Sequence, residues 1–119
     1  MIRHHVKEKI VIELQRNFKI NTYHDIIDVA ATAAYNEGHN NIHIAFYKES
    51  LHEDFFDLKT RIAGEMLQKF INYNIKIAIL GTFDNYSSKS LRDFIREANR
   101  TGDVMFLDGL ETYLNMLAI

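Results

Sequence analysis

Apolar residues recur most regularly across residues 53–73, EDFFDLKTRIAGEMLQKFINY. Read with the period of an α-helix, they form one stripe broad enough to cover a sheet. Asp54 and Asp57 fall in the first turn, where carboxylates meet the positive end of the helix dipole. The run IKIAIL, residues 75–80, follows at once and is typical of a buried strand. The pattern predicts one long helix that leads into a central strand.

Strand and helix patterns alternate along the rest of the chain. Further strands are predicted at residues 9–15, 42–47 and 104–107, and residues 2–6 could form an additional partner strand. Capping residues mark the ends of three further helices. The markers are Asn21 or Thr22 with Asp25, Gly38 before the turn His39-Asn40-Asn41, Ser87 or Ser88, and Asp108 with Glu111. The alternation predicts an α/β fold with a mainly parallel four- to five-stranded sheet and about four helices.

Composition narrows the class of protein. A chain of 119 residues with 47% hydrophobic residues fits one domain over residues 1–119. A net charge of -2 gives no reason to expect nucleic acid or an anionic membrane as partner. The chain has no cysteine, no apolar run of membrane-spanning length and no signal-peptide pattern at its start, so we expect a cytoplasmic protein.

Common cofactor motifs do not fit the sequence. The five glycines lie far apart, which excludes the glycine-rich loops that bind dinucleotides and phosphates. Gln15-Arg16-Asn17 follows the first strand where a response-regulator receiver needs acidic residues for Mg²⁺. The six histidines, including His39 and His43, lack the spacing of a zinc site. We expect neither a metal nor a cofactor.

Two groups of residues are candidates for function. Asp54, Asp57, Lys59 and Glu65 could form an acid/base cluster, although a role in helix-dipole and surface charge pairing is the simpler interpretation. The turn-rich segment 81–88 should lie beyond the carboxyl ends of parallel strands, together with Lys48, Glu49 and Asp108. Its aromatic residues either anchor a partner or fold back over the end of the sheet. These are Phe83 and Tyr86, with Asp84 and Arg92 nearby.

Residues 55–99 carry a series of short motifs that resembles a bacterial family known as domain of unknown function 4180. The motifs are FFDLKT at 55–60, AGE at 63–65, LQKF at 67–70, NY at 72–73 and SLRDFI at 90–95. The resemblance covers about the last two thirds of the chain and implies no known activity.

The order of elements is also similar to the STAS domain of anti-sigma-factor antagonists. In that family a serine at the start of the central helix is phosphorylated, which switches partner binding. The equivalent stretch here, residues 56–60, contains no serine, and Thr60 is its nearest hydroxyl. The resemblance implies the STAS architecture, without the serine that carries the switch.

Two hypotheses follow. In the first, the protein is a non-enzymatic STAS-like module that binds a protein partner or itself. In the second, it is a small enzyme or ligand-binding protein that uses Asp54, Asp57, Lys59 and Glu65; the sequence does not identify a ligand. The binding residues we expect are Asp54, Asp57, Lys59, Thr60, Phe83, Asp84, Tyr86 and Arg92.

Overall fold

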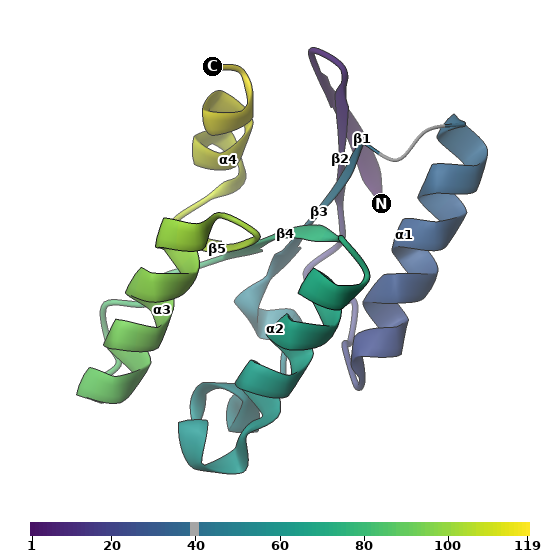
Figure 1. The fold of residues 1–119 in the computed structure, drawn as a ribbon. Coiled ribbons are helices and arrows are strands. Elements are labelled where there is room, and N and C mark those ends of the chain that lie inside the picture. Colours follow the sequence, from purple (N-terminus) through teal and green to yellow (C-terminus); the bar gives the residue numbers. More distant parts are fainter. Residues whose placement is uncertain (39–40) are drawn as a thin grey trace.

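The computed structural model describes residues 1–38 and 41–119. Its strands are β1 (Ile2–Val6), β2 (Lys9–Glu13), β3 (Ile42–Tyr47), β4 (Lys76–Leu80) and β5 (Val104–Leu107). Its α-helices are α1 (Tyr23–Glu37), α2 (Ile62–Asn72), α3 (Lys89–Thr101) and α4 (Leu110–Leu117) (Figure 1). Three short 3₁₀ helices, η1 (Lys48–Ser50), η2 (Glu53–Phe56) and η3 (Leu58–Thr60), connect β3 to α2. The predicted α/β class is confirmed.

The five strands form one sheet in the order β1-β2-β3-β4-β5. Strands β2 to β5 are parallel, whereas β1 pairs with β2 in the antiparallel direction, with Val6 opposite Lys9 and Ile2 opposite Glu13. The sheet is therefore mixed, because a two-residue turn at Lys7 and Glu8 reverses the chain after β1. Helical crossovers join the parallel strands, as their geometry requires.

The two faces of the sheet are covered unequally. One face packs against α1, α2 and α3 and forms the larger core, in which Ile44, Ile77, Phe46 and Phe70 are fully buried. The opposite face forms a smaller cluster that includes Val11, Ala78 and Tyr113, packed beneath α4. Since α4 spans only eight residues, it covers part of that face.

The predicted long helix at residues 53–73 is wrong over its first third. The helix begins at Ile62, and residues 53–60 instead form two 3₁₀ turns. Arg61 has a left-handed backbone, with φ of 65°, which an α-helix cannot accommodate. Asp54 and Asp57 therefore do not occupy the first turn of α2.

Most other boundaries agree with the sequence pattern. Thr22 and Asp25 form the capping box of α1, and Gly38 ends this helix with φ of 75°. Ser88, not Ser87, caps α3 by accepting a hydrogen bond from Leu91 N. The predicted cap at Asp108 is wrong because Gly109 is the N-cap of α4. His39 and Asn40 of the predicted turn lie outside the described residues.

Candidate functional site

The irregular segment before α2 is held by its own polar side chains. Thr60 Oγ1 donates toward Asp54 O at 2.7 Å and lies 2.8 Å from Asp57 O. Asp57 Oδ1 accepts from Lys59 N at 3.2 Å, and thereby caps η3. Short polar side chains that bond nearby backbone groups compete with helix formation in this way. The result is a compact segment of two 3₁₀ turns, not an α-helix, whose charged side chains stay exposed.

Aromatic rings join this segment to the loop after β4. Phe56 stacks on Tyr86 with ring centroids 5.1 Å apart and lies 6.1 Å from Phe83. Phe83 in turn meets the buried ring of Phe106 edge-on at 5.3 Å. Phe83 and Tyr86 are therefore partly buried and fold back over the end of the sheet, as in the second of the two alternatives for this loop.

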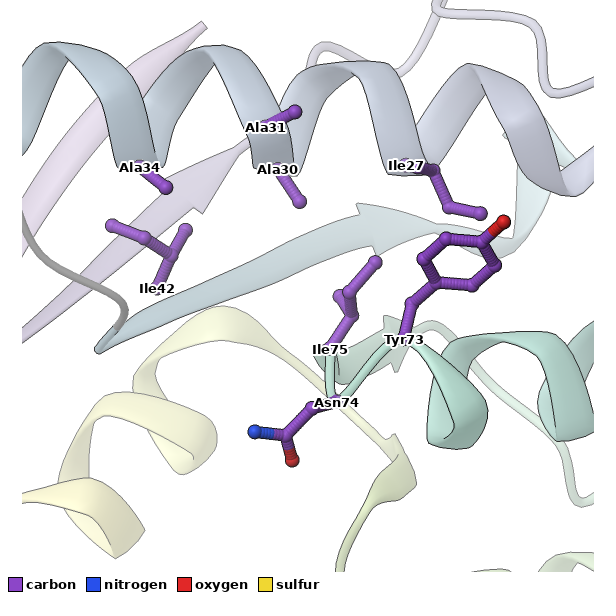
Figure 2. Close-up of a pocket in the computed structure, with 8 residues that line it drawn as sticks. All are labelled: Ile27, Ala30, Ala31, Ala34, Ile42, Tyr73, Asn74 and Ile75. Carbon is purple, nitrogen blue, oxygen red and sulfur yellow. The ribbon is translucent and has the colours of Figure 1, made fainter.

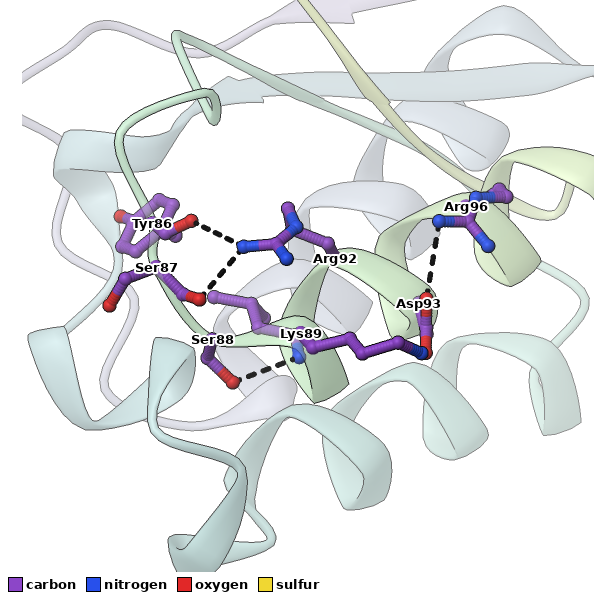
Figure 3. Close-up of polar contacts among 8 residues, drawn as sticks. Tyr86, Ser87, Ser88, Lys89, Arg92, Asp93 and Arg96 are labelled. Atoms are coloured by element: carbon purple, nitrogen blue, oxygen red, sulfur yellow. Dashed lines mark hydrogen bonds and ion pairs between the residues drawn. The ribbon is translucent and has the colours of Figure 1, made fainter.

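Two basic side chains fix the loop further. Lys48 Nζ donates to Thr82 O at 2.6 Å and lies 5.3 Å from the centre of the Tyr86 ring. From the other side, Arg92 Nη1 donates to Ser87 O at 2.8 Å and approaches Tyr86 O at 3.4 Å (Figure 3). Burial, with the negative charge of Glu53, raises the pKa of Tyr86 above its ordinary value. The loop is thus held at both ends by side chains from separate elements.

We call residues 53–60 and 81–88 together the carboxyl-edge surface, because they lie beyond the carboxyl ends of β3 and β4. This surface contains Asp54, Asp57, Lys59 and Thr60 in one segment and Phe83, Asp84 and Tyr86 in the other. Arg92 supports it from α3. The fold places these expected binding residues along one surface, with Lys59 and Asp84 exposed. Their role in binding stays a prediction.

The proposed acid/base cluster does not share one hollow. Asp54 lines a hollow of about 240 Å³ beside Leu51 and Met66, which Asp57, Lys59 and Glu65 do not line. The carboxylate of Asp54 lies 3.4 Å from His52 Nδ1.

A polar network that the sequence pattern did not reveal lies on the face of the sheet that α4 partly covers. Glu13 accepts a hydrogen bond from Tyr47 OH at 2.6 Å, and its other oxygen lies 2.9 Å from His4 Nε2. The Arg16 guanidinium stacks 3.8 Å above the Tyr47 ring. Burial raises the pKa of Glu13, but the bonds from Tyr47 and His4 outweigh it and leave this pKa below its ordinary value. The hydrogen bond to Glu13 raises the pKa of Tyr47. A depression of about 460 Å³ opens beside these residues.

Another hollow, of about 370 Å³, lies at the amino ends of β3 and β4. Its walls come from α1, from the start of β3 and from the turn between α2 and β4 (Figure 2). The lining residues are Ile27, Ala30, Ala31, Ala34, Ile42, Tyr73, Asn74 and Ile75. Apart from the Tyr73 phenol the lining carries no titratable side chain, so this hollow offers no acid/base pair.

Metal-ligand clusters and membrane-spanning helices are both absent from the described part of the chain. Within residues 1–38 and 41–119, no three His, Asp or Glu side chains gather in a way that could hold a metal ion. Among those same residues, none of the helices combines the length and apolar character needed to cross a bilayer. His39 of the His39/His43 pair lies outside these ranges.

The fold and its surface define a small α/β protein with a five-stranded mixed sheet and a surface built on aromatic packing. The family model described as domain of unknown function (DUF4180) matches residues 6–117. The chain belongs to this family, and the match extends well beyond the last two thirds of the chain. Among curated proteins and among solved structures, none matches this chain.

Proposed function

We propose that this protein is a non-enzymatic, STAS-like interaction module whose carboxyl-edge surface binds a protein partner. The observation that carries the proposal is the stacking of Phe56 on Tyr86, which fixes two irregular segments as one surface. Because the two segments are already fixed in the free protein, binding has few groups left to order, and such preorganisation favours affinity.

The chemistry of the surface supports a protein partner. Its exposed groups include the carboxylates of Asp54, Asp57 and Asp84 and the ammonium of Lys59, above aromatic rings that are only partly buried. Interfaces typically combine an aromatic centre with a charged rim of this kind. The order of elements from β2 to α4 agrees with that of the STAS domain, which is an argument by analogy.

The hydroxyl of Thr60 bears on how such a module could be switched. Its Oγ1 lies within hydrogen-bond distance of the carbonyl oxygens of both Asp54 and Asp57, and so holds η2 against η3. Phosphorylation of Thr60 would remove this donor and add negative charge beside two aspartates. A switch at Thr60 would therefore act by loosening the segment.

The second hypothesis, an enzyme that uses Asp54, Asp57, Lys59 and Glu65, has less support. Asp57 already caps its own backbone, and the hollow beside Asp54 is lined by none of the other three residues. General acid/base chemistry needs such groups to converge on one substrate position.

Site-specific photocrosslinking tests the proposal. We would place p-benzoylphenylalanine at Asp57, at Asp84 and, as a control, at Tyr35, which is 88% exposed on α1. In cells that produce the protein, Asp57 and Asp84 should yield the same adduct, and Tyr35 should not. Lys59→Glu should weaken that adduct without changing the melting temperature. Equal labelling from Tyr35, or no adduct from either surface position, would refute the proposal.

A further inference from the structure

The two edge strands of the sheet, β5 and β1, differ in whether their outward-facing backbone groups have hydrogen-bond partners. At β5, Ile77 N donates to Asp103 O and Gly81 N to Leu107 O, so the backbone groups of Phe106 point away from the sheet. The Asn99 side chain satisfies both, since its Oδ1 accepts from Phe106 N at 2.6 Å and its Nδ2 donates to Phe106 O at 3.1 Å. An amide side chain thus takes the place of a neighbouring strand at this edge.

Strand β1 forms the other edge, and its register shows which groups face outward. Ile10 N donates to Asn41 O and Leu14 N to Ala45 O, so the even-numbered residues of β2 bond to β3. Lys9, Val11 and Glu13 must then bond to their partners Val6, His4 and Ile2 in β1. This leaves the N–H and C=O groups of Arg3 and His5 pointing away from the sheet. Among residues 1–38 and 41–119 these groups have no backbone partner, and unpaired edge groups of this kind are a template for another strand.

The edge strand is also fixed in place. His4 lies within hydrogen-bond distance of Glu13, which in turn accepts from Tyr47 of β3. This network ties three strands together, so β1 does not have to be ordered when a new strand pairs with it.

Charge selects the kind of strand that fits. Residues 1–9 hold three basic residues, one acidic residue and two histidines, whereas the whole chain carries a net charge of -2. In a two-fold pairing of β1 with a second copy, the outward residues would face each other. Arg3 would then lie opposite Arg3, His5 or Lys7 of the other copy. Like charges directly opposite one another destabilise a pair of strands, so self-pairing is disfavoured.

From these observations we infer that β1 accepts an extended acidic segment of another protein as a sixth strand. The acidic side chains of that segment lie opposite Arg3 and His5, on the α1 side of the sheet. Its alternate, apolar side chains lie beside Ile2 and Val6, and Ile2 is 56% exposed. Arg3 Nε already contacts Glu37 Oε1 at 2.8 Å, which engages one of the five guanidinium donors. Strand addition of this kind draws affinity from the main chain and specificity from alternate side chains.

The test uses the full chain and a fluorescent seven-residue peptide, blocked at both ends, in which glutamate alternates with valine and threonine. A matched peptide carries lysine in place of glutamate. Polarisation should show binding of the acidic peptide, with at least about tenfold weaker binding of the lysine peptide. The amide protons of Arg3 and His5 should become protected from exchange on binding.

Two substitutions locate the site. His5→Pro removes an outward N–H but no hydrogen bond to β2. It should therefore weaken binding of the acidic peptide by about tenfold while the fold is retained. His5→Glu should reverse the preference toward the lysine peptide. Lys59→Glu also adds negative charge, but on the carboxyl-edge surface, and should leave the affinity unchanged, which separates this inference from the proposed function. If His5→Pro does not fold, the peptide methylated at alternate backbone nitrogens replaces it, with the same loss expected.

Three results would overturn the inference. One is that the acidic peptide does not bind at concentrations up to about 1 mM, which corresponds to a binding free energy weaker than about 4 kcal/mol. The basic residues of β1 would then serve only to protect the edge from aggregation. Another is binding that neither His5→Pro nor the methylated peptide weakens. The third is a dimer in sedimentation that His5→Pro dissociates, because a second copy would then occupy the edge.

Discussion

Acid should destabilise this protein through one histidine beneath α4. His43, on β3, is partly buried, and its Nδ1 lies 2.8 Å from the hydroxyl of the buried Tyr113. Burial, together with the nearby ammonium groups of Lys9 and Lys76, lowers the pKa of His43 to about 4. Burial raises the pKa of Tyr113, so its phenol keeps the proton that a neutral His43 can accept. Protonation of His43 removes this acceptor.

The sign and size of the effect follow from proton linkage. Above the ordinary histidine pKa of about 6.5, folded and unfolded chains are both neutral at His43, and stability is unaffected. As the pH falls from about 6.5 toward 4, only the unfolded chain binds the proton, and stability is progressively lost. At pH 5 the full shift corresponds to about 2 kcal/mol, and because the ring is only partly buried we expect about 1 to 2 kcal/mol.

Urea unfolding of the protein and of His43→Gln at pH 7 and pH 5 measures this term. Glutamine keeps a hydrogen-bonding group near Tyr113 but does not titrate. Other groups, including Glu13, should contribute equally to both proteins. The wild-type protein should therefore lose about 1 to 2 kcal/mol more than His43→Gln between the two pH values. Parallel losses in the two proteins would show that His43 is not held neutral by its environment.

Substitutions at three further positions test local packing and hydrogen bonding. Ser50 is 2% exposed, and its hydroxyl has no hydrogen-bond partner among the described residues. Ser50→Ala should therefore raise the free energy of unfolding by about 1 kcal/mol, and a clear loss of stability would show that the hydroxyl does have a partner. Thr60→Val should lower the free energy of unfolding by about 1 to 2 kcal/mol and Thr60→Ser by less, because only valine lacks the hydroxyl. Equal losses would argue against a role of that hydroxyl in holding η2 and η3 together. Phe83→Ala should cost about 2 kcal/mol, more than a surface change, because the ring packs on two others; denaturant melts within about 0.5 kcal/mol of wild type would contradict this packing.

Hydrophobic periodicity predicted the strands well because their runs are short and bounded by turns. It failed at residues 53–61 because apolar spacing there fits a helix and no glycine or proline interrupts it. The available signal was weaker: Asp57 and Thr60 belong to the residue types that bond nearby backbone groups. The left-handed backbone of Arg61 could not be predicted from its residue type, because arginine has no preference for positive φ. Local hydrogen bonds therefore decided the outcome over periodicity.

The site was predictable only in part, for a geometric reason. The carboxyl ends of parallel strands meet at one edge, so the general position of residues 81–88 beyond β4 followed from the topology. The Glu13 network and the contact between His43 and Tyr113 depend on partners that lie 34 and 70 residues apart in the sequence. Those partners are set by strand register and by the placement of α4. A single sequence contains no local signal for either.

The end of β3 connects the two surfaces proposed for this protein. Tyr47, the last residue of β3, reaches Glu13 and the β1 network, whereas Lys48, the first residue of η1, reaches Thr82 and Tyr86. Contact alone does not couple two sites, because coupling needs an element with two arrangements that both ligands bias. Both side chains are held by hydrogen bonds in the one arrangement the structure shows. We therefore expect the surfaces to bind independently, so that Lys48→Met weakens partner crosslinking at Asp84 but leaves the acidic peptide's affinity within about twofold. A larger change in that affinity would mean that β3 transmits binding from one surface to the other.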